Sequence, residues 1–157
     1  MSNQIDSAIF TKQLLTLLEE AFEKVHGAFL DGGTSFFETL APLTAKQASC
    51  SVTDSGSTIA GQVTHVRFYL KVLEDYIDGK SDDKVDWKQS WLTRSVTEKE
   101  WDVLRQGLKD DYTRVVTHLN GITEWNDDHR LGGAISIIVH TAYHLGAVRQ
   151  ILHVARK

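Results

Sequence analysis

Two histidines four residues apart, His140 and His144, lie in the last long apolar segment of the chain. On a helix, residues at this spacing share a face, about 40° apart around the axis and roughly 6 Å apart along it. Two imidazoles in that geometry can reach one metal ion. The surrounding residues are apolar on nearly every side, which predicts a buried helix. Buried imidazoles need hydrogen-bond partners or a metal, because an unsatisfied polar group is costly in an apolar environment.

Four long segments with helical periodicity are expected to position these histidines. Apolar residues recur at spacings of three and four over residues 5–30, 57–78, 97–125 and 131–156. No segment has the alternating pattern of a strand, and no internal repeat is present. The predicted architecture is therefore an all-α four-helix bundle in a single domain covering residues 1–157, with a long connection between the first two long helices.

Helix-start and helix-stop signals divide these segments. Thr44 and Thr97 are each followed three positions later by Gln or Glu, which is the pattern of a capping box, so a helix is expected to begin after each. A further short helix is expected to run to about Leu40. Residues 31–33 (DGG) are expected to end the first long helix at about Leu30, because glycine suits a helix C-terminus. Residues 49–57 read as a loop, and the glycine pair 132–133 loosens the entry to the last helix.

A third histidine, His65, lies on the shoulder of the apolar face of the second long segment, in one row with Gln62 and Tyr69. Metal sites in helical bundles are built from side chains on facing helices, so this histidine can join His140 and His144. The chain has seven histidines, and a pair at helical spacing can arise by chance. In the alternative interpretation, all three are core residues hydrogen-bonded to backbone carbonyls and to one another.

Two motifs resemble those of the DinB-like, or YfiT-like, superfamily. Residues 58–66 (TIAGQVTHV) resemble its second-helix signature, and residues 140–146 (HTAYHLG), followed by RQI at 149–151, resemble its fourth-helix signature. The similarity extends in order over residues 5–155. It implies a four-helix bundle with a three-histidine divalent metal site, in which His65, His140 and His144 are the ligands. It further implies a thiol-dependent transferase or isomerase, a hydrolase, or a member without catalytic activity.

Three neutral imidazoles would leave a divalent metal its full charge and an open coordination position. Zinc or nickel is the metal that we expect first, although iron and cobalt also suit imidazole ligands. A water bound there can ionise near neutral pH, and a bound thiol loses its proton. We expect activation of a low-molecular-weight thiol for transfer to an electrophile, because this chemistry needs no separate general base.

Two alternatives remain open at this point. A metal-dependent hydrolase would need a general base near the metal, whereas the glutamates of the first segments (Glu19, Glu20, Glu23 and Glu38) are expected mostly on polar faces. A non-catalytic, stress-related binding module would have its metal site closed by a fourth protein ligand. Whether the chain is an enzyme is therefore undecided from the sequence.

Several residues near the histidines are candidates for binding a small-molecule substrate. Trp87 and Trp91 lie in a charged loop and are expected to fold over an apolar region at the mouth of a pocket. Arg149 could bind a substrate carboxylate, although a structural ion pair is the alternative. The candidate substrate-binding residues are Gln62, Tyr69, Trp91, Tyr143 and Arg149.

Composition narrows the class of protein. Hydrophobic residues make up 41% of the chain and charged residues 24%, with a net charge of −4 and no long basic run, which argues against broad binding to nucleic acid. The single cysteine, Cys50, suits a reducing compartment. No signal peptide or long apolar run is recognised, so a cytoplasmic protein that does not enter a membrane is expected. Apolar residues beyond one stripe make a homodimer possible.

Overall fold

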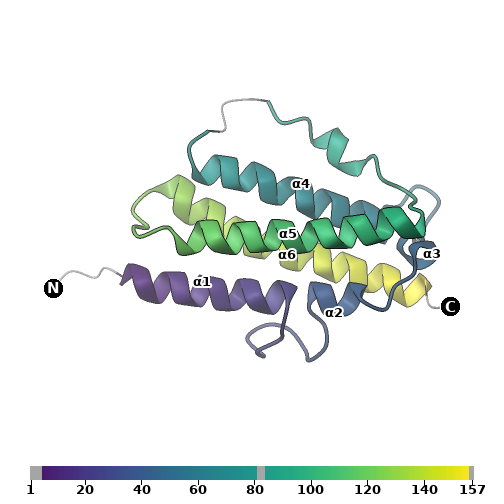
Figure 1. The fold of residues 1–157 in the computed structure, drawn as a ribbon, viewed down its shortest axis with the longest axis horizontal. Coiled ribbons are helices and arrows are strands. Elements are labelled where there is room, and N and C mark those ends of the chain that lie inside the picture. The colour runs from purple at the N-terminus through teal and green to yellow at the C-terminus, as the bar shows by residue number, and fades with distance from the viewer. Residues whose placement is uncertain (1–4, 81–83, 156–157) are drawn as a thin grey trace.

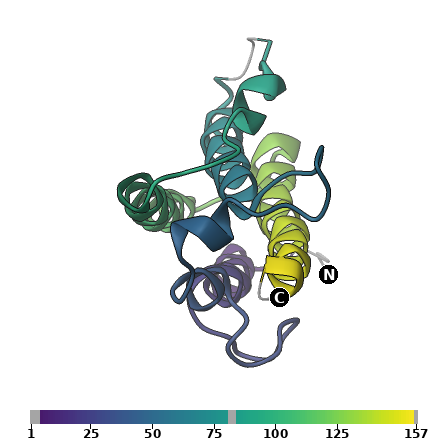
Figure 2. The ribbon, with the colours of Figure 1, turned by 90° about the vertical axis from the view of Figure 1, so that its right-hand side faces the viewer.

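The computed structural model describes residues 5–80 and 84–155, and these residues form helices and no strand. Four long helices run side by side (Figure 1), and seen end-on they surround a common centre (Figure 2). The long helices are α1 (Ser7–Phe22), α4 (Ile59–Ile77), α5 (Glu98–Asn120) and α6 (Asp128–Ala155). Three short helices lie in the connections: α2 (Phe36–Leu40), α3 (Ala45–Ala48) and the 3-10 helix η1 (Trp87–Trp91). The all-α prediction is confirmed.

Apolar side chains from all four long helices form one core. The largest of the fully buried apolar side chains are Trp101, Phe22, Phe36, Leu18, Ile59, Leu70, Leu108, Leu119, Ile137 and Leu145. The indole N–H of Trp101 donates to the carbonyl of Leu43 at 2.8 Å, so the one polar atom of this large side chain has a partner. This hydrogen bond links the connection between α2 and α3 to α5.

The first helix is shorter than predicted. It ends at Phe22 instead of Leu30, because the side chain of Glu20 provides a competing set of hydrogen bonds. Both carboxylate oxygens of this fully buried residue accept backbone N–H groups from the following turn, at distances of 2.7–3.1 Å. The donors are His26, Ala28, Phe29 and Leu30. The expectation that Glu20 faces solvent is therefore wrong.

The electrostatics of Glu20 follow from this arrangement. Burial alone would raise its pKa, but four backbone N–H donors stabilise the carboxylate and lower the pKa from 4.5 to about 2. The charged side chain thus takes the place of helical hydrogen bonds in holding the segment from 26 to 30.

The last helix begins earlier than predicted and includes the glycine pair. An Asp127 carboxylate oxygen accepts the backbone N–H of Arg130 at 2.8 Å, which caps the helix start. Gly133 lies within the helix and directly against α4: a Cβ atom added there would lie 2.6 Å from Cγ1 of Ile77. This glycine therefore allows a close approach of α6 to α4, instead of interrupting the helix.

The predicted helix starts in the connections are confirmed. Ser35, Thr44 and Thr97 each form a capping box with the residue three positions later. Two boundaries differ: α5 ends at Asn120 instead of Trp125, and the loop carrying the tryptophans contains η1. The loop over residues 49–57 holds an isolated antiparallel bridge between Ser51 and Thr58.

By length and composition alone, α6 would be long and apolar enough to cross a membrane, and it is the only such helix in residues 5–80 and 84–155. In this structure it packs against α4 and α1. Its buried side includes His144, while Ile135, Val139 and Tyr143 are exposed on its outer side. An apolar stripe on both sides explains why its sequence shows no polar face.

Candidate metal centre

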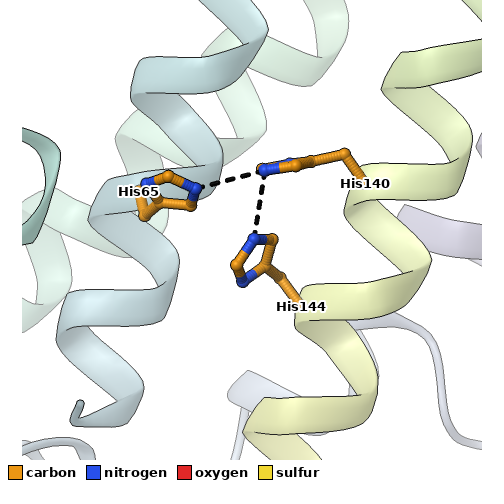
Figure 3. A group of neighbouring side chains, drawn as sticks. All are labelled: His65, His140 and His144. Atoms are coloured by element: carbon orange, nitrogen blue, oxygen red, sulfur yellow. Dashed lines mark hydrogen bonds between the residues drawn. The ribbon is translucent and has the colours of Figure 1, made fainter. Parts of the chain in front are cut away.

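Three imidazoles from two helices point toward one another. His65 projects from α4, and His140 and His144 project from successive turns of α6, which packs alongside (Figure 3). The Nε2 atom of His140 lies 3.1 Å from Nε2 of His65 and 3.1 Å from Nε2 of His144. The potential ligand atoms of all three lie within 4.8 Å of one another. The three histidines predicted from the sequence thus come together in a group that could hold a metal ion.

The outer nitrogen of His65 is fixed by a serine from η1. Nδ1 of His65 lies 2.7 Å from Oγ of Ser90, and the Ser90 hydroxyl in turn donates to the carbonyl of Trp87 at 2.7 Å. Because a hydroxyl has a single proton, Ser90 must accept from His65, so the imidazole proton is on Nδ1. The lone pair of Nε2 therefore faces the centre, as a metal ligand requires.

A glutamine from α4 fixes the outer nitrogen of His144. Nδ1 of His144 lies 2.5 Å from Oε1 of Gln62, and the amide nitrogen of Gln62 donates to Oγ of Ser57 at 2.6 Å. An amide oxygen only accepts, so the imidazole proton is again on Nδ1 and the Nε2 lone pair faces inward. Gln62 was predicted either to bind a substrate or to face solvent; it is buried and contacts His144.

His140 is held in a different way. Its ring stacks on that of Tyr69, with centroids 3.4 Å apart and planes 5° from parallel. Its Nδ1 atom is buried and has no hydrogen-bond partner within the described residues. If Nε2 carried the proton, that one proton would have to serve the two lone pairs of His65 and His144. A cation at the centre would instead accept all three Nε2 lone pairs.

Burial favours the neutral form of His65, His140 and His144. Burial lowers the pKa of His65 below its ordinary value. Burial, and then repulsion from His144 and His65, lowers the pKa of His140 to about 3. Burial, and then repulsion from His65, lowers the pKa of His144 to about 4. A low pKa keeps the imidazole unprotonated, which is the form that binds metal.

The spacing of His140 from each of the other two histidines fits a divalent metal. A tetrahedral zinc ion holds its imidazole nitrogens roughly 3.3 Å apart, close to the two 3.1 Å separations at His140. Among the described residues, the group contains no fourth histidine, cysteine or carboxylate. Three protein ligands with further coordination positions are typical of catalytic zinc sites, whereas structural sites have four.

Aromatic rings surround the three imidazoles. The ring of Trp91 stacks on His65, with centroids 4.1 Å apart and planes 15° from parallel, and Tyr143 meets His144 edge-on at 5.0 Å. Trp91 and Tyr143 are 38% and 74% exposed, so both also face solvent. Trp87 and Trp91 were expected to fold over an apolar region at the mouth of a pocket; Trp91 lines a pocket and lies on an imidazole, and Trp87 is 41% exposed.

Two residues depart from the sequence prediction. Arg149 is half-buried, and the structure gives it no ion pair or hydrogen bond to any residue in 5–80 or 84–155, so the alternative of a structural ion pair is not seen there and its substrate-binding role stays a prediction. Ser90 was not predicted at all. Its only signal is its position between two tryptophans in a loop, which does not by itself indicate a contact with a histidine on another helix.

Comparison of the chain with protein-family models, with curated proteins and with solved structures gave no match in any of the three. The candidate metal centre therefore depends on the geometry of this chain alone.

Proposed function

We propose that this protein is a divalent-metal-dependent enzyme that activates a low-molecular-weight thiol for transfer to an electrophilic small molecule. The observation that carries the proposal is the convergence of three Nε2 atoms, two of which have their lone pairs directed inward by Ser90 and Gln62. A zinc or nickel ion bound by His65, His140 and His144 would lower the pKa of a coordinated thiol and supply a thiolate near neutral pH.

The polar contacts of the three histidines favour thiol chemistry over hydrolysis. Their hydrogen-bond partners within the described residues are Ser90, Gln62 and one another, and none is a carboxylate. Metal-dependent hydrolysis commonly uses a general base to take a proton from water. A thiol with a pKa near 8.5 needs only a modest decrease to ionise at pH 7, so the metal alone suffices.

The side chains around the centre have separate roles in this proposal. Ser90 and Gln62 orient His65 and His144, and Tyr69 holds the His140 ring by stacking. The partly exposed rings of Trp91 and Tyr143 offer an apolar surface for the electrophile. We also propose that the four long helices form a DinB-like bundle, since the second and last long helices carry the motifs that resemble that family.

A conjugation assay tests the proposal. Protein loaded with zinc or nickel is mixed with glutathione and 1-chloro-2,4-dinitrobenzene, and the thioether is followed by absorbance. We expect metal-dependent turnover that is lost in His144→Ala and retained in His153→Ala, which removes an exposed histidine from the end of the same helix. Turnover of a nitrophenyl ester without any thiol conjugation would contradict the proposal and favour a hydrolase.

A further inference from the structure

A small pocket adjoins the metal centre. It has a volume of about 340 Å³ and is lined by Ser55, Ser57, Trp91, Thr93 and Arg94. One of these residues contacts the histidine group directly, and a second contacts it through Gln62. Trp91 stacks on His65 at 4.1 Å, and Ser57 accepts from the Gln62 amide that holds His144. The pocket and the metal centre therefore share a wall and a hydrogen-bonded support.

Arg94 gives this pocket a positive charge with a fixed orientation. Its Nη2 atom donates to the carbonyls of Asp54 at 3.0 Å and Gly56 at 3.1 Å, so the guanidinium is tied to the loop that forms the pocket. The N–H donors on Nε and Nη1 have no partner within the described residues, and each can give a charge-assisted hydrogen bond to a carboxylate oxygen. An arginine that is already oriented loses less conformational entropy when it binds an anion.

Arg94 and Arg149 differ from the other arginines in residues 5–80 and 84–155, because neither forms an ion pair. Ion pairs with carboxylates within the described residues are formed by Arg67, Arg105, Arg114 and Arg130. Arg94 has no carboxylate within ion-pair distance in residues 5–80 and 84–155, although Asp54 provides a backbone carbonyl to it. Its charge is thus held by neutral carbonyls and is available to an anion.

Backbone packing keeps the pocket against α4. A Cβ atom added at Gly61 would lie 2.8 Å from the carbonyl oxygen of Thr93, so this glycine lets the segment before Arg94 lie directly on the first turn of the helix. The N-terminal turn of α4 begins two residues after Ser57 and adds partial positive charge near the same place. Both features favour an anionic group in the pocket.

We propose that this pocket binds a carboxylate of the thiol substrate, with Arg94 as the anchoring residue and the hydroxyls of Ser55 and Thr93 as further donors. The thiol is then one that carries a carboxylate within reach of its sulfur, and its recognition is separate from its binding at the histidines. This inference rests on the proposed function for the identity of the ligand, whereas the pocket itself is formed without any metal.

Matched probes test the proposal: glutathione, and glutathione diethyl ester, in which both carboxylates are blocked. Isothermal titration on zinc-loaded protein gives both dissociation constants at low ionic strength. We expect glutathione to bind about tenfold more tightly than the ester, as a charge-assisted hydrogen bond allows. Arg94→Gln should bind the two probes equally, and Arg105→Gln should retain the preference for glutathione. Arg105 is a matched control, because it also donates to a backbone carbonyl and the net charge changes equally.

A second variant separates anion binding from loop support. Ser55→Phe fills the pocket and leaves both backbone bonds of Arg94 in place, so it should also remove the preference for glutathione. Equal affinities for the two probes in the natural protein, or a preference that survives both Arg94→Gln and Ser55→Phe, would overturn the proposal.

The same titration distinguishes this inference from the proposed function. In His144→Ala, both probes should bind more weakly, but the ratio between them should persist. If the natural protein binds no metal yet prefers glutathione to its ester, the carboxylate pocket stands and thiol activation fails. If metal binds and conjugation proceeds without any such preference, the pocket proposal fails and the proposed function stands.

Discussion

Ser90 and His65 form the contact that decides which histidine nitrogen faces the metal centre. Nδ1 of His65 lies 2.7 Å from Oγ of Ser90, and the hydroxyl proton of Ser90 is already donated to the carbonyl of Trp87. A serine on the short helix η1 thus fixes the tautomer of a histidine on α4. The connection that carries η1 thus contributes a contact to the candidate metal centre.

Ser90→Ala should weaken metal binding. Without the acceptor, His65 can place its proton on either nitrogen, and removing a partner of this kind typically costs about 10- to 100-fold in metal affinity. Zinc affinity measured by competition with a chromophoric chelator checks this. Ser95→Ala, an exposed serine on the same connection, should leave the affinity unchanged. Equal affinities in all three proteins would show that Ser90 has no such role.

Neighbouring glycines in α6 should respond to alanine in opposite directions. At Gly133, an added methyl group would meet Ile77 at 2.6 Å, and such overpacking costs about 1–3 kcal/mol. At Gly132, no atom lies within 4 Å of the added Cβ, so the better helix propensity of alanine should stabilise the protein by about 1 kcal/mol. Urea unfolding of the two variants measures both effects. A stabilising Gly133→Ala would contradict the close packing of α6 on α4.

Glu20→Gln should destabilise the protein by about 3 kcal/mol at pH 7, because a charged acceptor for four backbone N–H groups is replaced by an amide that has only one acceptor oxygen. Unfolding by urea at several pH values measures this. Glu19→Gln is the matched control: its carboxylate is partly exposed, and its side-chain hydrogen-bond partner among the described residues is His26, so its loss should cost less than about 1 kcal/mol.

The pH dependence of this effect has a definite sign. The folded pKa of Glu20 is about 2, below the ordinary value of 4.5, so the unfolded chain binds the proton more readily. The stabilisation that the Glu20 carboxylate gives the folded protein is complete above about pH 4.5 and decreases as the pH falls toward 2. The stabilities of the natural protein and Glu20→Gln should therefore converge in acid. A constant difference down to pH 2 would contradict the low pKa.

Much of the fold could be predicted because it depends on local signals. The periodicity of apolar residues predicts all four long helices, and the capping boxes at Thr44 and Thr97 mark helix starts that the structure contains. His65, His140 and His144 were predicted together, since helical spacing and position on an apolar face are visible in a sequence. The structure brings these three into one group.

The remaining features depend on contacts between residues far apart in the chain. Glu20 has the sequence environment of a polar face, and only the loop folding back onto it makes it buried. In the sequence alone, Gly133 favours a break in the helix; its contact with Ile77 of α4 shows that it allows close packing of two helices instead. Ser90 and Arg94 lie in a polar connection whose path over α4 has no periodic signal, so neither could be assigned a role from the sequence.

The metal content of the protein tests the central claim most directly. Untagged protein, His65→Ala and His144→Ala are each dialysed against zinc, then against metal-free buffer, and analysed by mass spectrometry of the elements. Convergence of three imidazoles predicts about one zinc ion per chain in the natural protein. Loss of metal in both variants, with helical content unchanged by circular dichroism, would agree with metal binding by the three histidines. Natural protein that retains neither zinc nor nickel would contradict it and leave the three histidines as a hydrogen-bonded part of the core.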